Sequence, residues 1–283
     1  AADTSRGRQP SASERKRVKL LHRRTTPVSL SDNGSTDGLR SYIESRAATT
    51  SHELTWVDAS HVRGASYARN VGAARARGEL LVFCDADDRV HVDWLRWLVD
   101  RARSADIVSC AVETETINPP AVHKWRPLYP SDKRFHARFL PFVFGAGFAV
   151  DRALYMHVGG CDETLVHGGE DVDLSWRIQL AGGTLAHEKR SVVAYRSRAT
   201  LRGLWHQTRR YGVADARLFK SYRGYGMPRA TWSDLFWTVV TLLVNNPLVP
   251  QSLSRIDRGR WVSLVAFLVG NWQGSVRHRV LYF

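Results

Sequence analysis

The chain is organised around the stretch Gly78-Glu79-Leu80-Leu81-Val82-Phe83-Cys84-Asp85-Ala86-Asp87-Asp88. Five consecutive apolar residues, 80–84, are too few for an amphipathic helix and predict a β-strand that is buried on both faces. Three carboxylates follow within four positions. Because ligands gather where the strands of an open α/β sheet end, Asp85 and Asp87 are candidates to share one Mg²⁺ or Mn²⁺, which substrate phosphates would complete. The alternative is a polar loop in which Asp88 caps the next helix.

The size and composition of the chain favour a folded protein with a real core. Its 283 residues, 43% of them hydrophobic, suit one large domain, or one domain with an appendage. The three cysteines, Cys84, Cys110 and Cys161, are widely spaced and form no Cys-x-x-Cys motif, so we expect buried thiols in a reducing compartment. No apolar segment near the amino terminus is typical of a signal peptide, and we expect a cytoplasmic protein.

The net charge of +14 is unevenly distributed. Residues 1–26 carry +6 and residues 196–283 carry +11, whereas residues 27–195 carry −3. A nucleic-acid-binding domain would more often be basic where its fold is, so we expect no nucleic-acid partner. Basic ends beside apolar helices instead favour contact with an anionic membrane surface.

Strand and helix patterns alternate along the first two thirds of the chain. The predicted strands lie at 27–31, 56–58, 80–84, 106–112 and 145–150. The predicted helices lie at 66–77, 94–104, 152–158 and 170–180, with another beginning near Leu39. This alternation predicts an α/β fold with a mostly parallel sheet and helices on both faces. Between Val112 and Gly145, five prolines predict an extended, loop-rich region that lines a site.

Two further groups of carboxylates stand at predicted turns. Asp32 ends the first strand in Asp32-Asn33-Gly34-Ser35-Thr36-Asp37, which forms a tight turn before a helix. Glu170 and Asp171 begin a helix after two glycines, where the helix dipole favours negative charge. The alternatives are an ordinary turn for Asp32 and simple helix capping for the other two. Asp173 and Arg177 are spaced to pair on the helix surface.

The carboxyl-terminal third is helical and partly apolar. A basic helix begins at Leu201, and two apolar segments with several tryptophans follow at 232–250 and 261–273. Neither segment is an uncharged span of about 20 residues, which a transmembrane helix requires. Tryptophan beside arginine predicts helices that lie in a membrane interface. The alternative is a helical pair that packs on the rest of the chain or on a second subunit.

Four motifs together resemble a known family. The segments Asp32–Asp37, Ala68–Gly72, Asp85–Asp88 and Gly169–Leu174 are similar, in order and separation, to the successive motifs of family 2 glycosyltransferases. The resemblance spans roughly residues 27–215. It implies a GT-A fold, with a nucleotide-sugar-binding catalytic domain that we place at 27–200. The composition adds a basic tail at 1–26 and a helical, membrane-associated extension at 201–283. It also implies a metal-dependent reaction that inverts the sugar carbon of a nucleoside-diphosphate sugar, with a lipid-linked or cell-envelope glycan as acceptor.

The resemblance also implies roles for particular residues in donor binding. Asp32 would contact the nucleoside, and Asp85 the ribose or the metal. Asp87 would hold the Mg²⁺ or Mn²⁺ that bridges the diphosphate. Arg69 and Asn70, in the second motif, would belong to the donor site.

The acceptor side of the reaction needs a base. Asp171, with Glu170 beside it, stands where the family keeps the carboxylate that removes a proton from the acceptor hydroxyl. Such a base can come from a different loop than the metal carboxylates, because in-line displacement needs only one base.

The chain departs from the family pattern in two places. Relatives begin with a strand and a helix before the first motif, whereas only a basic tail precedes Pro27, so we expect the first β-α unit to be missing. Many relatives complete the metal site with a histidine where this chain has Ala194, and His187 or His206 are the possible substitutes. These departures motivate an alternative, an inactive membrane-bound scaffold. A nucleotidyltransferase is a further alternative, but its glycine-rich phosphate loop is not visible.

Overall fold

The computed structural model describes residues 26–126, 135, 137–166, 168–247 and 254–282. The predicted basic tail at 1–26 therefore lies outside the described residues except for its last position. The predicted absence of a first β-α unit concerns the same region and stays a prediction. Part of the predicted proline-rich region and the end of the predicted apolar segment 232–250 also lie outside the described residues.

The amino-terminal layer is a small parallel unit. Its elements are β1 (Val28–Asp32), α2 (Leu39–Thr49), β2 (Leu54–Asp58) and α3 (Ala65–Arg75). The two strands pair in parallel, with Asp32 opposite Asp58 at their carboxyl ends. Helix α3 approaches β1 so closely that a Cβ on Gly72 would lie 2.5 Å from Ser31 Oγ. This contact places α3, which contains the second motif, beside the end of β1.

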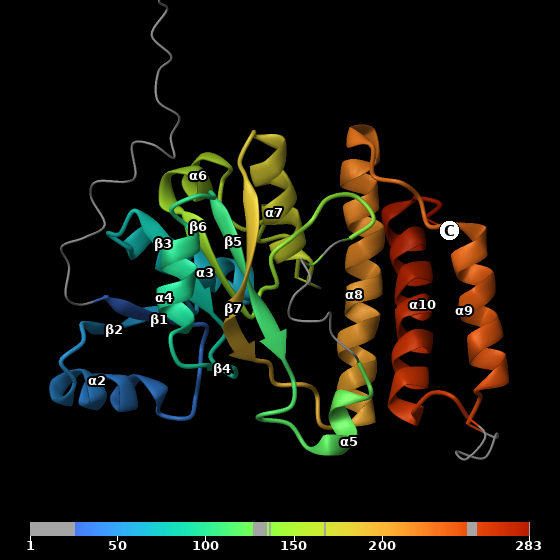
Figure 1. Ribbon diagram of the computed structural model, residues 1–283, viewed down its shortest axis with the longest axis horizontal. Helices are drawn as coiled ribbons and strands as arrows, with labels where there is room; N and C mark the ends of the chain where they lie inside the picture. Colours follow the sequence, from blue (N-terminus) through green and yellow to red (C-terminus); the bar gives the residue numbers. More distant parts are fainter. Residues whose placement is uncertain (1–25, 127–134, 136, 167, 248–253, 283) are drawn as a thin grey trace, which may run out of the picture.

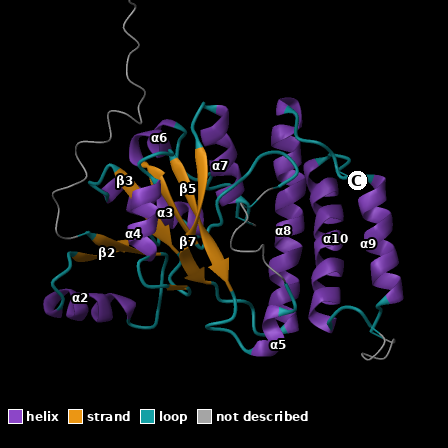
Figure 2. Ribbon diagram, in the orientation of Figure 1, coloured by secondary structure: helices purple, strands orange, loops and turns teal. Residues whose placement is uncertain are grey.

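The main sheet has five strands in the order β3-β6-β5-β7-β4, and Figure 2 draws the strands in orange. The strands are β3 (Leu80–Cys84), β4 (Arg89–Val90), β5 (Ile107–Glu113), β6 (Gly147–Asp151) and β7 (Leu185–Ala194). Only β5 and β7 pair in parallel in this sheet, and the other three pairs are antiparallel. The prediction of a mostly parallel sheet is therefore wrong. A parallel pair needs a crossover, usually a helix, but α5 (Pro120–His123) is too short to provide one between β5 and β6.

The strand that is buried on both faces is β5, not β3. Residues Ile107 to Val112 are all at most 4% exposed, because β5 lies between β6 and β7 with helices on either side. Strand β3 has the predicted bounds, but it is an edge strand within the described part of the chain, and only Leu81 is buried there. Its last residue, Cys84, is accordingly exposed, whereas Cys110 and Cys161 are the buried thiols that the sequence predicts.

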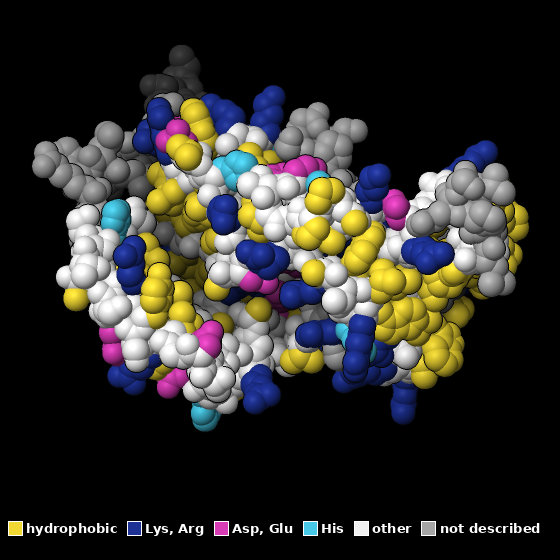
Figure 3. All heavy atoms as spheres, turned by 90° about the horizontal axis from the view of Figure 1, so that it is seen from below, with side chains coloured by type: hydrophobic (Ala, Val, Ile, Leu, Met, Phe, Trp, Pro, Cys, Tyr) yellow, Lys and Arg dark blue, Asp and Glu magenta, His cyan; other side chains and the backbone are white. Residues whose placement is uncertain are grey.

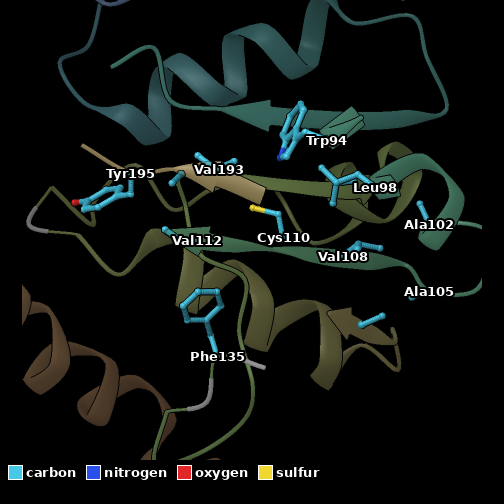
Figure 4. Packing of buried hydrophobic residues seen from close by; sticks show 13 residues of the cluster. Trp94, Leu98, Ala102, Ala105, Val108, Cys110, Val112, Phe135, Val193 and Tyr195 are labelled. Atoms are coloured by element: carbon cyan, nitrogen blue, oxygen red, sulfur yellow. The ribbon is translucent and has the colours of Figure 1, made fainter. Parts of the chain in front are cut away.

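Two apolar clusters fill the space on the faces of the sheet. Trp94 and Leu98 of α4 (Trp94–Arg101) pack on Val108 and Cys110 of β5, as Figure 4 shows. The second cluster lies under α6 (Arg152–His157) and α7 (Glu170–Leu180) and contains, among others, Ile107, Phe148, Val150, Leu174 and Ile178. The packing of α7 on this cluster holds its first turn at the end of the sheet.

The remaining helices form a layer beside the sheet (Figure 1). They are α8 (Leu201–Tyr222), the 3₁₀ turn η2 (Arg223–Tyr225), α9 (Trp232–Val244) and α10 (Arg258–His278). Helices α8 and α10 touch along their backbones, since a Cβ on Gly270 would overlap the Arg209 carbonyl oxygen. Helix α9 contributes no buried side chain. In the described part of the chain, no helix has both the length and the apolar character that spanning a membrane requires.

Candidate active site

The acidic loop after β3 extends over the sheet edge. The Asp85 N–H donates to the Ala146 carbonyl at 3.2 Å, which ties the loop to the start of β6. The Asp87 side chain is 52% exposed and faces Arg198, with 3.9 Å between Arg198 Nη2 and Asp87 Oδ2. Asp87 is therefore free to bind a cation.

Asp88 does not cap a helix, so that interpretation is wrong. Its Oδ1 accepts a hydrogen bond of 2.7 Å from the Arg196 N–H, just beyond β7. Helix α4 begins only at Trp94, with Asp93 at its N-cap position. Burial raises the pKa of Asp88 to about 7, and the Arg196 N–H opposes this shift. This hydrogen bond of Asp88 thus holds the acidic loop beside the end of β7.

A buried guanidinium joins three segments at the centre of the site. Arg69 of α3 is 9% exposed, and its Nη2 donates to Asp85 Oδ1 at 2.7 Å. Its Nη1 donates to Glu170 Oε1 at 2.8 Å, and Nη2 also reaches the Gly145 carbonyl at 3.1 Å. The two carboxylates belong to segments 85 residues apart in the chain. Arg69 therefore brings the acidic loop and the start of α7 to one place.

Asp171 faces the same place from the first turn of α7. Its Oδ2 accepts from the Gly145 N–H at 2.7 Å, and its Oδ1 accepts from the Val172 N–H at 2.9 Å. The N-cap position is Gly169, at φ 84°, and no side chain caps the helix there. Burial, and next the charge of Glu170, raise the pKa of Asp171 to about 6. A carboxylate with such a pKa accepts protons better near neutral pH than an ordinary aspartate.

Asp173, the third carboxylate of α7, makes structural contacts. Asp173 pairs with Arg177 at 2.7 Å, as the spacing predicts, but not on the helix surface, since Asp173 is only 7% exposed; its Oδ1 also accepts from the Tyr222 hydroxyl at 2.6 Å. Arg177 in turn donates to the Val158 and Gly160 carbonyls. This network anchors α7 to its neighbours, so Asp173 is not available as a base.

Asp32 lies at the end of β1 with both oxygens engaged. Oδ1 accepts from the Ser35 N–H at 2.8 Å, and Oδ2 accepts from the Trp56 indole at 3.0 Å. The Ser35 N–H is the first cause of its lowered pKa. These contacts hold the turn in one conformation, and the proposed contact of Asp32 with a nucleoside stays a prediction.

Asn70 is directed toward the loop before Glu163. Its amide donates to the Cys161 carbonyl at 2.9 Å and to Glu163 Oε1 at 2.8 Å. Its carbonyl oxygen accepts from the Tyr155 hydroxyl at 2.7 Å. The structure thus gives Asn70 a scaffolding environment, and its place in the donor site stays a prediction.

The carboxylates suit a hard divalent cation, but neither histidine completes a site. Asp85 and Asp87 supply oxygen ligands, which Mg²⁺ and Mn²⁺ prefer, and substrate phosphates and water would fill the other positions. His187 lies within β7 against the Phe135 ring, with 6.1 Å between centroids. Among the described residues, no three His, Cys, Asp or Glu side chains form a metal-binding group. A cation here would therefore depend on ligands from the substrate.

Sequence reasoning missed several contributors. The backbone of Gly145 contacts both Arg69 and Asp171, and a Cβ there would lie 3.1 Å from Asp171 Oδ2. The small residues 145–147 are the only sequence signal for this close approach. Arg196 and Arg198 flank the acidic loop from the segment after β7, and no local pattern marks them.

The chain is similar to several glycosyltransferases. It is 31% identical over 196 residues to the pre-mycofactocin glycosyltransferase of Mycobacterium tuberculosis, covering 64% of this chain and 41% of that protein. It is 28% identical over 196 residues to polypeptide N-acetylgalactosaminyltransferase 11 of Xenopus tropicalis, covering 61% of this chain and 32% of that one. The chain thus spans less than half the length of these curated relatives.

A solved structure shares the fold. It is the mannosyltransferase PcManGT from Pyrobaculum calidifontis in complex with GDP-Man and Mn²⁺, at a TM-score of 0.56 and 19% identity over 87% of this chain and 77% of that one. The model of the family Glycosyl transferase family 2 matches residues 19–159, which include α3 and the acidic loop. The order of the motifs, this match and the shared fold agree, and the chain belongs to glycosyl transferase family 2.

Proposed function

We propose that this protein transfers a sugar from a nucleoside diphosphate to an acceptor hydroxyl, with inversion at the sugar carbon and dependence on Mg²⁺ or Mn²⁺. The contact that carries the proposal is the double ion pair of Arg69 with Asp85 and Glu170. It places the acidic loop, which would hold the diphosphate end of the donor, against the helix turn that carries Asp171.

Asp171 is the proposed base and Glu170 is not. Glu170 is held by Arg69, so its charge is already compensated. Asp171 has its Oδ2 oriented by the Gly145 N–H, and its pKa is raised, to about 6, by burial first and by Glu170 second. As the acceptor oxygen attacks the sugar carbon, its proton would pass to the Asp171 carboxylate while the bond to the diphosphate breaks.

The departing diphosphate needs positive charge at the opposite side of the sugar. Asp87, with Asp85, would hold a divalent cation that offsets the charge of this leaving group. Arg198, 3.9 Å from Asp87, adds a protein cation near the same loop. The GDP-Man and Mn²⁺ in the mannosyltransferase of similar fold support this assignment.

A nucleotide-binding measurement tests the proposal. UDP, GDP, dTDP and CDP are each added with and without Mn²⁺, and the unfolding temperature is measured for the wild type, Asp87→Ala and the control Asp100→Ala. Asp100 is an exposed carboxylate on α4, outside the site. A nucleotide at about 100 times its Kd stabilises the folded state by about 2.7 kcal/mol.

The expected result is stabilisation by one nucleotide, dependent on Mn²⁺, in the wild type and the control but not in Asp87→Ala. If none of the four nucleotides stabilises a cooperatively melting wild type, the inactive scaffold becomes the better interpretation. Release of pyrophosphate from a nucleoside triphosphate would instead favour the nucleotidyltransferase.

We also propose that the protein attaches peripherally to an anionic membrane surface, on the cytoplasmic side, and acts on a lipid-linked or envelope acceptor. Helix α9 exposes a large apolar face, which includes Trp232, Phe236, Trp237 and Leu243, each at least 59% exposed. Figure 3 shows a broad apolar surface with Lys and Arg side chains beside it.

The positive charge around this apolar face favours an anionic lipid surface over a protein partner. Residues 229–282 contain six arginines and two aspartates, and the Arg229 guanidinium lies 5.4 Å from the Trp232 ring. Tryptophan and arginine together suit the headgroup region of an anionic bilayer. The free thiols of Cys110 and Cys161 agree with a reducing compartment.

Co-sedimentation with vesicles tests the attachment. Vesicles with anionic lipid should retain the wild type at low salt, and purely zwitterionic vesicles should retain less. Trp237→Ser should weaken retention without lowering the unfolding temperature, because the side chain is 62% exposed. A protein that stays in the supernatant with both vesicles, or that is dimeric through this face by light scattering, would contradict the proposal.

A further inference from the structure

A small pocket lies between the segment after β7 and the first turns of α8. Its lining includes Trp125, Arg126, Tyr195, Arg198 and Gln207. Two of these residues connect it with the reacting centre. Arg198 reaches Asp87, and Tyr195 follows directly after Ala194, the last residue of β7. The pocket therefore opens beside the acidic loop.

Arg126 is a cation without a described counter-charge. Its guanidinium lies over the Tyr211 ring, 4.7 Å from the centroid. Burial lowers the pKa of Arg126, but the hydroxyls of Tyr211 and Tyr195 more than offset this effect; its Nη1 alone is buried with no hydrogen-bond partner among the residues that the structure describes. A buried charged group of this kind costs stability unless something pairs with it. The cost is explained if a ligand supplies the missing acceptor.

Tyr211 relates Arg126 to the base. A Cβ on Gly168, two residues before Glu170, would lie 3.1 Å from the Tyr211 ring, so this ring packs against the loop that begins α7. Arg126 is thus linked through the Tyr211 ring to the loop that precedes Glu170 and Asp171. A group bound by Arg126 would lie next to the place where the acceptor hydroxyl must enter.

The surroundings of Arg126 add further positive charge. The first turn of α10 packs against Trp125, the residue before Arg126, since a Cβ on Gly259 would overlap the Trp125 ring. Burial, and next the charge of Arg126, lower the pKa of Arg260 on that turn. The amino-terminal turns of both α8 and α10 lie at this place, and the partial charge of a helix amino terminus is positive.

We propose that the pocket beside Arg126 and Gln207 binds a phosphate group carried by the acceptor. The inference rests on the proposed function, because it assigns the second substrate of that reaction. Guanidinium groups line the pocket beside the Gln207 amide, which also donates to the Tyr195 hydroxyl at 3.1 Å, and guanidinium donors suit a phosphate with several acceptor oxygens. A phosphate here would give Arg126 Nη1 its partner and would position a neighbouring hydroxyl of the acceptor toward Asp171.

Inorganic phosphate is the probe. It is titrated at constant ionic strength in Mn²⁺-free buffer, and then again with the nucleotide and Mn²⁺ that stabilise the wild type, with the unfolding temperature as readout. The variants are Arg126→Met, Arg126→Lys and the control Arg96→Met, whose side chain is 70% exposed on α4. The lysine variant retains a cation in case the methionine variant does not fold.

The expected result has three parts. Phosphate stabilises the wild type and the control, and the stabilisation adds to that of the nucleotide. In Arg126→Met the apparent Kd for phosphate rises about tenfold or more, because a charge-assisted contact is lost. Without phosphate, Arg126→Met melts close to the wild-type temperature, because removal of the buried cation and loss of its tyrosine contacts have opposite effects.

Other outcomes overturn the inference in distinguishable ways. An unchanged phosphate affinity in Arg126→Met, or in Arg126→Lys if the former does not fold, means that the pocket is not the anion site. Competition between phosphate and nucleotide, or loss of nucleotide binding in Arg126→Met, assigns the pocket to the donor diphosphate. Failure of the wild type to bind any nucleotide refutes the proposed function, and the phosphate titration then still decides whether the pocket binds anions.

Discussion

Replacing Asp171 by Asn should stabilise the protein at neutral pH while it removes the proposed base. The carboxylate is buried beside Glu170, and its pKa is raised from 3.8 to about 6, by burial first. A raised folded-state pKa means that the folded protein binds the proton more tightly than the unfolded chain does. The contribution of Asp171 to the free energy of unfolding is therefore most favourable below about pH 4, falls as the pH rises to about 6, and is level above.

The magnitude follows from the size of the shift. A difference of about two pKa units corresponds to about 3 kcal/mol by which the charged carboxylate disfavours the folded state at pH 7.5. Asparagine avoids this cost, but its NH₂ group must face one of two backbone donors, Gly145 N–H or Val172 N–H, which costs about 1–1.5 kcal/mol. The expected net stabilisation is about 2 kcal/mol at pH 7.5, whereas at pH 4 the misplaced NH₂ group leaves the variant slightly less stable than the wild type.

Urea denaturation at pH 7.5 and at pH 4 measures the difference, with Asp173→Asn as the control on the same helix. Asp173 is paired with Arg177, so its replacement should destabilise the protein by about 2 kcal/mol or more at pH 7.5. In an assay of sugar transfer, Asp171→Asn should lower kcat by a factor of about 10² to 10⁴, and the wild-type kcat/KM should decline below about pH 6. A variant that is destabilised equally at both pH values, or that keeps wild-type kcat, would refute this account of Asp171.

Three further changes have distinct expected outcomes. Asp87→Ala should abolish Mn²⁺-dependent nucleotide binding but leave the unfolding free energy within about 0.5 kcal/mol, because the side chain is 52% exposed; urea denaturation without ligand checks this. Arg69→Met should lower the unfolding free energy by about 3–5 kcal/mol in the same assay, since two carboxylates lose their buried partner, and wild-type stability would contradict the double ion pair. Gly270→Ala should lower the unfolding temperature by several degrees, because the new methyl group overlaps the Arg209 carbonyl and separates α8 from α10; a thermal melt that matches the wild type would show that the helices do not touch there.

Local patterns predicted the elements well where a short stretch carries the whole signal. The apolar run 80–84 is β3 with the predicted bounds, and the helix after the second glycine pair begins at Glu170. The i, i+4 spacing correctly predicted the ion pair of Asp173 and Arg177. These features depend on residues within one turn or one strand, so the sequence contains the information directly.

Strand direction and burial were not predictable in the same way. An apolar run of five residues has the same composition in a central strand and in an edge strand, so β3 was taken for the strand buried on both faces, which is β5. The antiparallel pairing of β6 with β5 could not be predicted, because the sequence between these two strands has no periodic pattern to indicate where the chain leads.

The sequence by itself determined the set of motifs, and with them the family and the candidate carboxylates. Only the tertiary structure decided how those carboxylates are related. Arg69 meets Asp85 across 16 positions and Glu170 across 101, and Asp171 is oriented by a backbone N–H 26 positions away. The physical reason is that charge compensation and burial act through space over a few ångströms, whereas a sequence pattern records only neighbours along the chain.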